Sequence, residues 1–173
     1  MCGGGAGKAV MTQAGEGDPY WYDSGLMTMR ARPHETGGSI SVVDVWVTRG
    51  KATPLHMHPD AEETFFVIGG DITLHIDGIN HDVGTGACWT IRRETPHAFA
   101  VRSQEARMIV VFTPGGAEEF FIEAGEPANV RQLPPRGEID IAKYQAAAAK
   151  TGLILLGPPP FDQKTPQLSV AAQ

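Results

Sequence analysis

The chain has 173 residues, of which 42% are hydrophobic and 20% are charged, and this length suits one domain with a core of its own. No apolar run approaches the length of a membrane span. The 20 acidic side chains outnumber the 14 basic ones, so the net charge repels phosphate backbones. These features exclude a membrane or a nucleic acid as the principal partner and favour a small molecule.

Cys2 and Cys88 are the only cysteines, which is too few for a disulfide framework or a thiolate zinc site. We expect Cys88 to lie in the core. The N-terminus has no long apolar segment before a cleavage site, so we expect no secretory signal and a cytoplasmic protein.

A single domain is expected between two loose tails. Residues 1–17 are rich in glycine and small side chains without periodicity, which predicts a flexible tail. Residues 18–160 make up the predicted domain, and residues 161–173 make up the second tail.

The predicted elements begin with a hairpin. Residues 26–31 and 39–48 are rich in apolar and β-branched side chains, and the segment Pro-His-Glu-Thr-Gly-Gly between them is typical of a turn. Further extended segments follow, separated by glycine-containing turns. They cover residues 63–68, 71–77, 87–92, 97–101 and 107–113.

Many short strands with glycine-rich turns indicate an all-β sandwich or barrel. In residues 71–77 apolar and polar side chains alternate, so Ile72, Leu74 and Ile76 share one face. His75 belongs to the other face, and we expect it to be exposed to solvent rather than to bind a metal.

After Phe112 the pattern becomes helical. Residues 115–125 predict a short helix, and residues 138–152 predict a longer one that ends where Gly152 supplies a left-handed cap. Both helices are expected to pack outside the strands. Residues 153–161 predict an apolar strip along the core, ended by prolines.

Two potential metal ligands lie in the segment from Gly50 to Gly70. His56 and His58 are two residues apart, so on an extended strand both side chains leave by the same face and can bind one ion.

A carboxylate follows, and the chain offers two candidates. An unbroken strand would place Glu62 on the face of the histidines and Glu63 on the opposite face. Pro59 and Asp60 break the strand, which shifts the alternation and favours Glu63. Imidazole and carboxylate donors together suit one divalent ion of Fe, Mn, Co, Ni or Zn.

The spacing resembles the first motif of the cupin superfamily, which reads Gly, five residues, His, one, His, four, Glu, six, Gly, and is complete here. The second motif ordinarily reads Gly, five residues, Pro, one, Gly, two, His, three, Asn. Only Gly86 and His97 match it, with Arg92, Glu94 and Val101 at the other positions. Because Glu94 replaces a glycine, the turn before His97 is expected to take another path if it needs a positive φ.

The resemblance implies an all-β cupin fold, a double-stranded β-helix or jelly-roll barrel, with short C-terminal helices packed outside. It also implies one divalent metal ion inside the barrel. The implied ligands are His56, His58, Glu63 and His97.

Strand alternation predicts the walls of an apolar cavity around these ligands. Side chains that follow Glu63 and His97 by even numbers of residues share their faces, and further core residues are candidates for deeper walls. Ordinary core packing is the alternative for each of them. The expected substrate-binding residues are Phe65, Val67, Phe99, Val101, Trp46, Met108 and Phe112.

Over roughly residues 17–160 the chain resembles small bacterial cupins that are likened to quercetin 2,3-dioxygenase. The resemblance is carried by residues 15–31, 110–128 and 152–160. It implies a metal-dependent dioxygenase that acts on a flavonol-like or other enolisable aromatic molecule, with dioxygen as the second substrate. Glu63 would then be both a metal ligand and the catalytic proton acceptor.

Two alternatives stay open. One is a metal-dependent isomerase, cyclase or lyase of secondary metabolism, in which the ion acts only as a Lewis acid. The other is a non-catalytic cupin that binds a small ligand. In each case a homodimer is expected, because dimers are common in the family.

Overall fold

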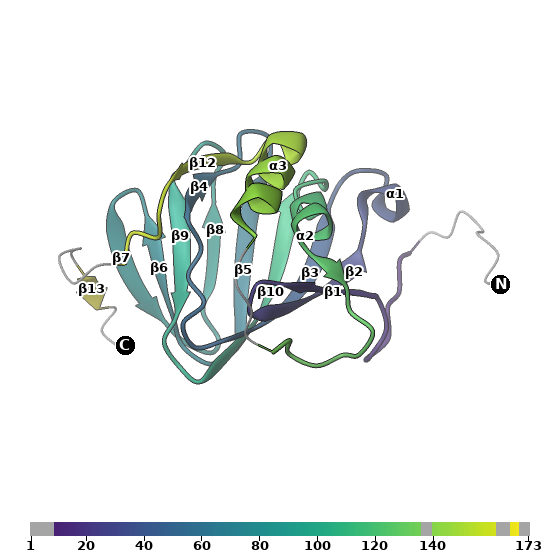
Figure 1. Cartoon of the computed structure of the whole chain (residues 1–173), viewed down its shortest axis with the longest axis horizontal. Helices are drawn as coiled ribbons and strands as arrows, with labels where there is room; N and C mark the ends of the chain where they lie inside the picture. Colours follow the sequence, from purple (N-terminus) through teal and green to yellow (C-terminus); the bar gives the residue numbers. More distant parts are fainter. Residues whose placement is uncertain (1–8, 136–139, 162–166, 170–173) are drawn as a thin grey trace.

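The computed structural model describes residues 9–135, 140–161 and 167–169. Parts of the two predicted tails lie outside the described residues. Within these ranges the chain forms two facing β-sheets with short helices outside them (Figure 1). The expected all-β, jelly-roll fold class is confirmed.

Over the described residues one sheet has seven strands, in the order β11-β1-β2-β3-β10-β5-β8, with antiparallel neighbours. They are β1 (Asp18–Tyr22), β2 (Gly25–Ala31), β3 (Ser41–Thr48), β5 (Glu62–Gly69), β8 (Cys88–Ile91), β10 (Glu105–Thr113) and β11 (Glu126–Pro127). The second sheet has the order β12-β4-β9-β6-β7-β13, and only β13 runs parallel to its neighbour. Its strands are β4 (Leu55–Met57), β6 (Ile72–Ile76), β7 (Ile79–Val83), β9 (His97–Val101), β12 (Ile154–Gly157) and β13 (Gln167–Ser169).

The predicted hairpin of residues 26–48 is confirmed, since β2 pairs with β3. One helical turn, α1 (Pro33–Thr36), fills the connection, and Gly37 closes it with a left-handed φ of 65°. The sequence did not predict β1. Pro19 and the adjacent aromatic residues interrupt any alternation in that segment, and its pairing with β2 supplies the strand's hydrogen bonds.

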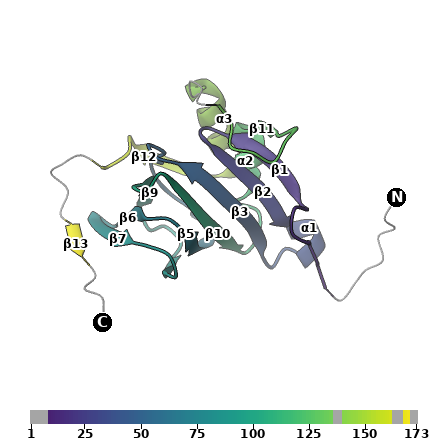
Figure 2. The same ribbon diagram turned by 90° about the horizontal axis from the view of Figure 1, so that it is seen from below.

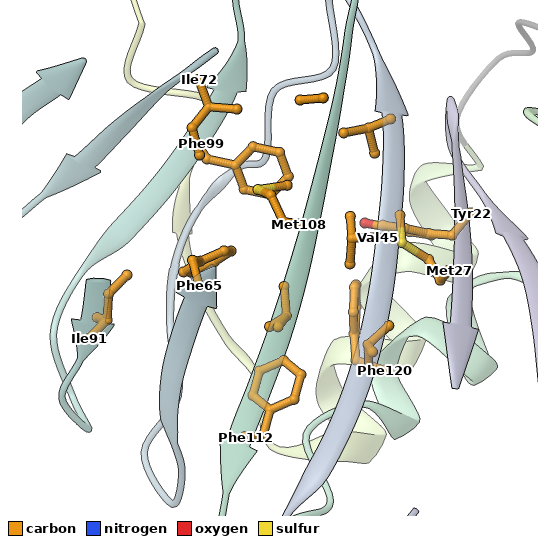
Figure 3. Close-up of a cluster of buried hydrophobic side chains, with 14 of the residues drawn as sticks. Tyr22, Met27, Val45, Phe65, Ile72, Ile91, Phe99, Met108, Phe112 and Phe120 are labelled. Atoms are coloured by element: carbon orange, nitrogen blue, oxygen red, sulfur yellow. The ribbon is translucent and has the colours of Figure 1, made fainter. Parts of the chain in front are cut away.

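The hydrophobic core lies between the two sheets. Phe65, Phe99, Met108 and Phe112 project from their strands into this space (Figure 3). The rings of Phe65 and Phe99, from opposite sheets, meet edge to face with centroids 6.0 Å apart, a favourable arrangement for aromatic pairs. Alternation along β3, β5, β9 and β10 therefore packs one side chain of every two into the core.

Two side chains face opposite to their predicted directions. Cys88 was expected in the core but is exposed, because it lies on the outer face of edge strand β8. His75 was expected in solvent but is only 5% exposed. Its Nδ1 lies 2.7 Å from Oδ1 of Asn80, and its ring packs near Phe161, so the segment after β12 covers this outer face.

Both predicted C-terminal helices are confirmed, as α2 (Glu119–Ala124) and α3 (Ile141–Thr151), and they lie outside the sheets (Figures 1 and 2). The Asp140 carboxylate accepts a hydrogen bond from the N–H of Lys143 and so caps α3, while Gly152 ends it with a φ of 76°. No helix within the described ranges is long and apolar enough to cross a membrane.

The turn before β9 takes the conformation that its sequence disfavours. Glu94 has a φ of 60°, and its N–H donates to the carbonyl oxygen of His58 at 2.9 Å. The expected other path is therefore not found. The turn keeps the left-handed conformation that a glycine would accept more readily, and Glu94 bears the strain of its Cβ.

Replacing Glu94 with glycine is expected to raise the free energy of unfolding by about 0.5–1 kcal/mol, because relief of this strain outweighs glycine's extra entropy in the unfolded chain. Glu94→Ala is the control, since it removes the carboxylate but keeps the Cβ. Urea denaturation of the three proteins measures the difference. A glycine variant no more stable than the alanine variant would show that position 94 is unstrained.

Candidate metal centre

Three strands bring the predicted ligands together. His56 lies in β4, directly opposite His97 of β9 in the same sheet, and His58 follows the end of β4. Glu63 comes from β5 in the facing sheet. The predicted strand break is present between β4 and β5, and it turns Glu63 inward to 5% exposure, while Glu62 stays half-buried.

The four side chains form one compact, buried cluster. One donor atom from each of His56, His58, Glu63 and His97 lies within 4.8 Å of all the others. Oε2 of Glu63 is 2.9 Å from Nε2 of His97 and 3.4 Å from Nε2 of His58. Donor atoms that each lie about 2.1 Å from a shared ion must be close in this way, so the cluster fits a divalent metal site.

Backbone carbonyls orient two of the imidazole rings. Nδ1 of His56 lies 2.8 Å from the carbonyl oxygen of Pro54, and Nδ1 of His97 lies 2.8 Å from that of Thr95. A carbonyl oxygen only accepts hydrogen bonds, so each Nδ1 carries a proton and the lone pair of a neutral ring is on Nε2. Metal-binding histidines are typically held by such outer hydrogen bonds.

The pKa values of the residues in the cluster shift in different directions. Burial lowers the pKa of His56 to about 3, and the charge on His97 adds to this effect. Burial would raise the pKa of Glu63, but hydrogen bonds from His58 and His97 hold it well below its usual range. Burial would lower the pKa of His97, yet its hydrogen bond and attraction to Glu63 raise it overall. Without an ion, Glu63 therefore favours the protonated form of His97, while burial keeps His56 neutral.

An apolar cavity of about 40 Å³ adjoins the cluster. Three of the predicted wall residues, Phe65, Phe99 and Phe112, line it. Val67, Val101 and Met108 are buried in the core but are not among its lining residues. Side chains outside the motif strands complete the wall, and motif spacing carried no signal for them. They are Tyr22, Thr53, Ala117, Phe120, Phe121, Tyr144 and Leu153.

The prediction that Trp46 lines this cavity was wrong. In β3, Val45 and Val47 are buried in the core, so the intervening Trp46 points to the outer face of the sheet. There its Nε1 donates to Oε2 of Glu105 at 3.0 Å, and its ring borders an outer hollow beside Arg107.

Comparison with known sequences identifies the family of the central strands. Residues 45–113 match the family described as "Cupin domain". Quercetin 2,3-dioxygenase of Bacillus subtilis (strain 168) is 26% identical over 148 residues, which make up 84% of this chain and 44% of that protein. The chain thus spans less than half the length of this curated relative.

Solved structures show the same fold. KdgF from a Halomonas species has a TM-score of 0.57 and 17% identity, over 62% of this chain and 94% of that one. A predicted oxalate decarboxylase from Thermotoga maritima also has a TM-score of 0.57, with 12% identity over 60% of this chain and 98% of that one. At these identities the likeness concerns the fold alone.

Proposed function

The chain carries a cupin domain, and from this premise we propose that it is a metal-dependent oxygenase that acts on a flavonol-like or other enolisable aromatic molecule. The observation that carries the proposal is the buried His56, His58, Glu63 and His97 cluster beside an apolar cavity. Four protein donors on an ion that prefers five or six ligands leave positions open, as in catalytic rather than structural sites. The 26% identity to a quercetin 2,3-dioxygenase supports the choice of reaction.

When bound, a divalent ion of Fe, Mn, Co, Ni or Zn would supply a positive charge that polarises a substrate oxygen. The three histidines would hold it, and His56 and His97 would do so through Nε2, the nitrogen that their carbonyl partners leave free. Phe65, Phe99 and Phe112 keep the surroundings apolar and limit the access of water.

Glu63 would accept the proton of an enolisable substrate. In the ion-free cluster, hydrogen bonds from His58 and His97 keep its pKa low, so its carboxylate is a weak base there. If these nitrogens bind an ion instead, they no longer donate to Glu63, and the charge of the ion and the apolar wall together would set the basicity of its carboxylate.

A homodimer belongs to the same proposal. Phe66 and Ile68 are about half exposed on the outer face of β5, and Ile109 of the neighbouring β10 lies opposite Phe66 in register. Apolar side chains that adjoin on an open sheet face support pairing with a second copy of the chain.

The proposal is tested by metal analysis of protein purified without added metal, followed by oxygen uptake with a panel of flavonols and enediols. We expect about one divalent ion per chain and oxygen uptake with at least one flavonol. Tight metal binding with conversion of a substrate but no oxygen uptake would favour an isomerase, cyclase or lyase. Binding without conversion would favour a ligand-binding cupin.

Metal binding is expected to release about one proton per ion at about pH 6, and progressively less toward about pH 9. The reason is that Glu63 raises the pKa of His97, so His97 is protonated at the lower pH and must lose that proton to bind an ion. Metal affinity should therefore fall as the pH decreases. Calorimetry in buffers of different ionisation enthalpy measures the release, and Glu63→Gln, which removes the cause of the raised pKa, should reduce it. Equal release at both pH values would contradict this assignment.

A further inference from the structure

The cavity beside the cluster is too small for the proposed substrate. Its volume of about 40 Å³ accommodates a few water-sized groups. A ring system of flavonol size needs a pocket on the order of 300 Å³. Only the metal-binding edge of such a molecule fits inside, so its rings must lie elsewhere.

A second hollow, the outer groove, adjoins this cavity and shares lining residues with it. Its volume is about 240 Å³. Three segments line it: residues 58–61 between β4 and β5, residues 114–117 before α2, and residues 151–153 at the end of α3.

Three side chains line both the outer groove and the inner cavity. They are His58, Ala117 and Leu153, and together they form the partition between the two spaces. His58 and Leu153 are buried, with 9% and 8% exposure. A substrate bound across the partition would have its rings in the groove and its oxygen atoms at the cluster.

We propose that the outer groove binds the ring system of a flat, polyhydroxylated aromatic substrate, and that Leu153 is the gate through which its chelating edge reaches the metal centre. This inference rests on the proposed function. It adds the place of the rings and a residue that controls access.

The lining of the groove suits a flat ring. Pro59, Pro114, Gly115, Gly116 and Gly152 contribute backbone and compact side chains rather than long ones. A ring can lie closely against such surfaces, because no long side chain has to be displaced. Asp60 is exposed in the same lining, and its carboxylate can accept hydrogen bonds from phenolic hydroxyls.

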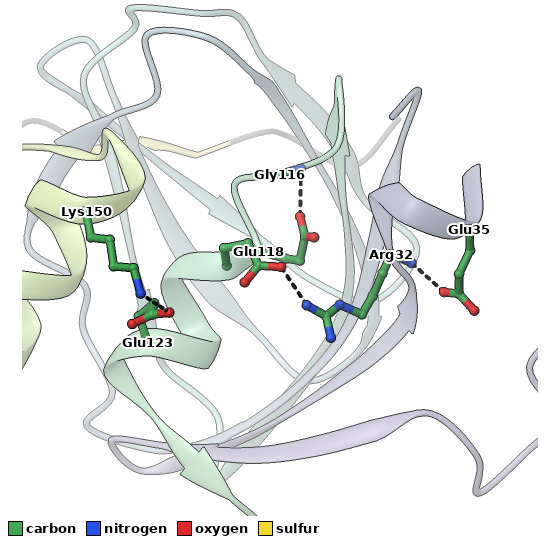
Figure 4. A network of polar contacts seen from close by, with 7 residues as sticks. Arg32, Glu35, Gly116, Glu118, Glu123 and Lys150 are labelled. Carbon is green, nitrogen blue, oxygen red and sulfur yellow. Dashed lines mark hydrogen bonds and ion pairs between the residues drawn. The ribbon is translucent and has the colours of Figure 1, made fainter. Parts of the chain in front are cut away.

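The segment before α2, which carries Ala117, is held in place (Figure 4). The N–H of Gly116 donates to Oε2 of the fully buried Glu118 at 2.8 Å. Arg32 forms an ion pair with Glu119 at 2.6 Å. These contacts fix the Ala117 side of the partition to α1 and α2.

His58 and Leu153, the other two residues of the partition, differ in how freely their side chains can move. The carbonyl of His58 accepts a hydrogen bond from Glu94, and its ring belongs to the cluster. Leu153 follows the left-handed cap Gly152 and precedes edge strand β12. A rotamer change of its flexible side chain opens the partition without breaking these contacts, so Leu153 is the gate.

The test uses the full chain loaded with Co²⁺, whose visible absorption changes when a ligand binds. Stopped-flow mixing measures the association rates of azide, which is slim, and of naphthalene-2,3-diol, which is a flat chelating ring system. Leu153→Ala should raise the association rate of the diol about tenfold and leave that of azide within about twofold. Leu26→Ala is the matched control. Leu26 is similarly buried, at 5% exposure, and it lines a different hollow, the one beside Trp46 and Arg107.

Ala117→Met is the second variant, because its longer side chain would narrow the partition from the fixed side. It should slow diol association and leave azide association nearly unchanged. If azide binds but the diol associates with both variants at the original rate, Leu153 is not the gate. The proposed metal centre is unaffected by that result. If neither cobalt nor azide binds, the proposed function fails, and this inference fails with it.

Discussion

Replacing Glu63 with glutamine is expected to leave a metal ion bound and to lower turnover of the flavonol identified by oxygen uptake about 10²- to 10⁴-fold. Glutamine keeps the size of the side chain and one oxygen donor, and three histidines remain as ligands. An amide cannot accept the substrate proton, so the loss should appear in turnover more than in metal content. Metal analysis and steady-state oxygen uptake measure the two quantities separately.

Glu62→Gln is the matched control, because Glu62 is the neighbouring carboxylate on the other face of β5. It should retain full turnover and full metal content. Full activity of Glu63→Gln would place the proton acceptor elsewhere. Equal losses in the two variants would mean that the strand break does not separate their roles.

Replacing Lys51 with methionine is expected to lower the free energy of unfolding by about 3–5 kcal/mol, because it leaves a carboxylate unpaired in a buried place. Nζ of Lys51 lies 2.6 Å from Oδ2 of Asp23, and their side chains are 2% and 14% exposed. The ammonium also lies 4.5 Å from the centroid of the Tyr22 ring. Burial lowers the pKa of Lys51, although Asp23 acts against this. Urea denaturation measures the loss.

Two further variants extend this test: a double variant that removes both charges, and a control at an exposed ion pair. Asn accepts the left-handed φ of 54° at position 23, so adding Asp23→Asn to Lys51→Met removes both charges and should recover part of the loss. Lys150→Met breaks the ion pair with Glu123, whose side chains are 65% and 33% exposed, and should cost less than about 1 kcal/mol. If Lys51→Met and Lys150→Met lower the free energy of unfolding by similar amounts, burial of the Lys51–Asp23 pair does not increase the cost of breaking it.

Local patterns predicted three of the four side chains in the cluster, and the resemblance to the cupin motifs implied the fourth, His97. The spacing of His56 and His58, together with the break at Pro59 and Asp60, selected Glu63 over Glu62, and the structure has this arrangement. Such patterns work because strand alternation and its interruption depend on residues that are neighbours in the chain.

Patterns failed where a side chain's surroundings come from distant segments. His75 has the alternation of an exposed residue, yet the ring of Phe161 packs against it. Trp46 is a different case, because its alternation with Val45 and Val47 in the same strand already places it on the outer face, and its assignment to the cavity overlooked this local pattern. The residue type alone does not determine on which face of a strand a side chain lies.

The sequence by itself determined the all-β class, the two C-terminal helices and three side chains of the cluster, His56, His58 and Glu63, because each follows from local spacing. The resemblance to the cupin motifs implied the fourth, His97. Only the tertiary structure decided how much room lies beside the cluster and what closes it. The closing side chains Tyr22, Tyr144 and Leu153 come from β1, α3 and the segment after α3. The volume that they leave depends on how these segments pack, and no spacing within the motifs encodes it.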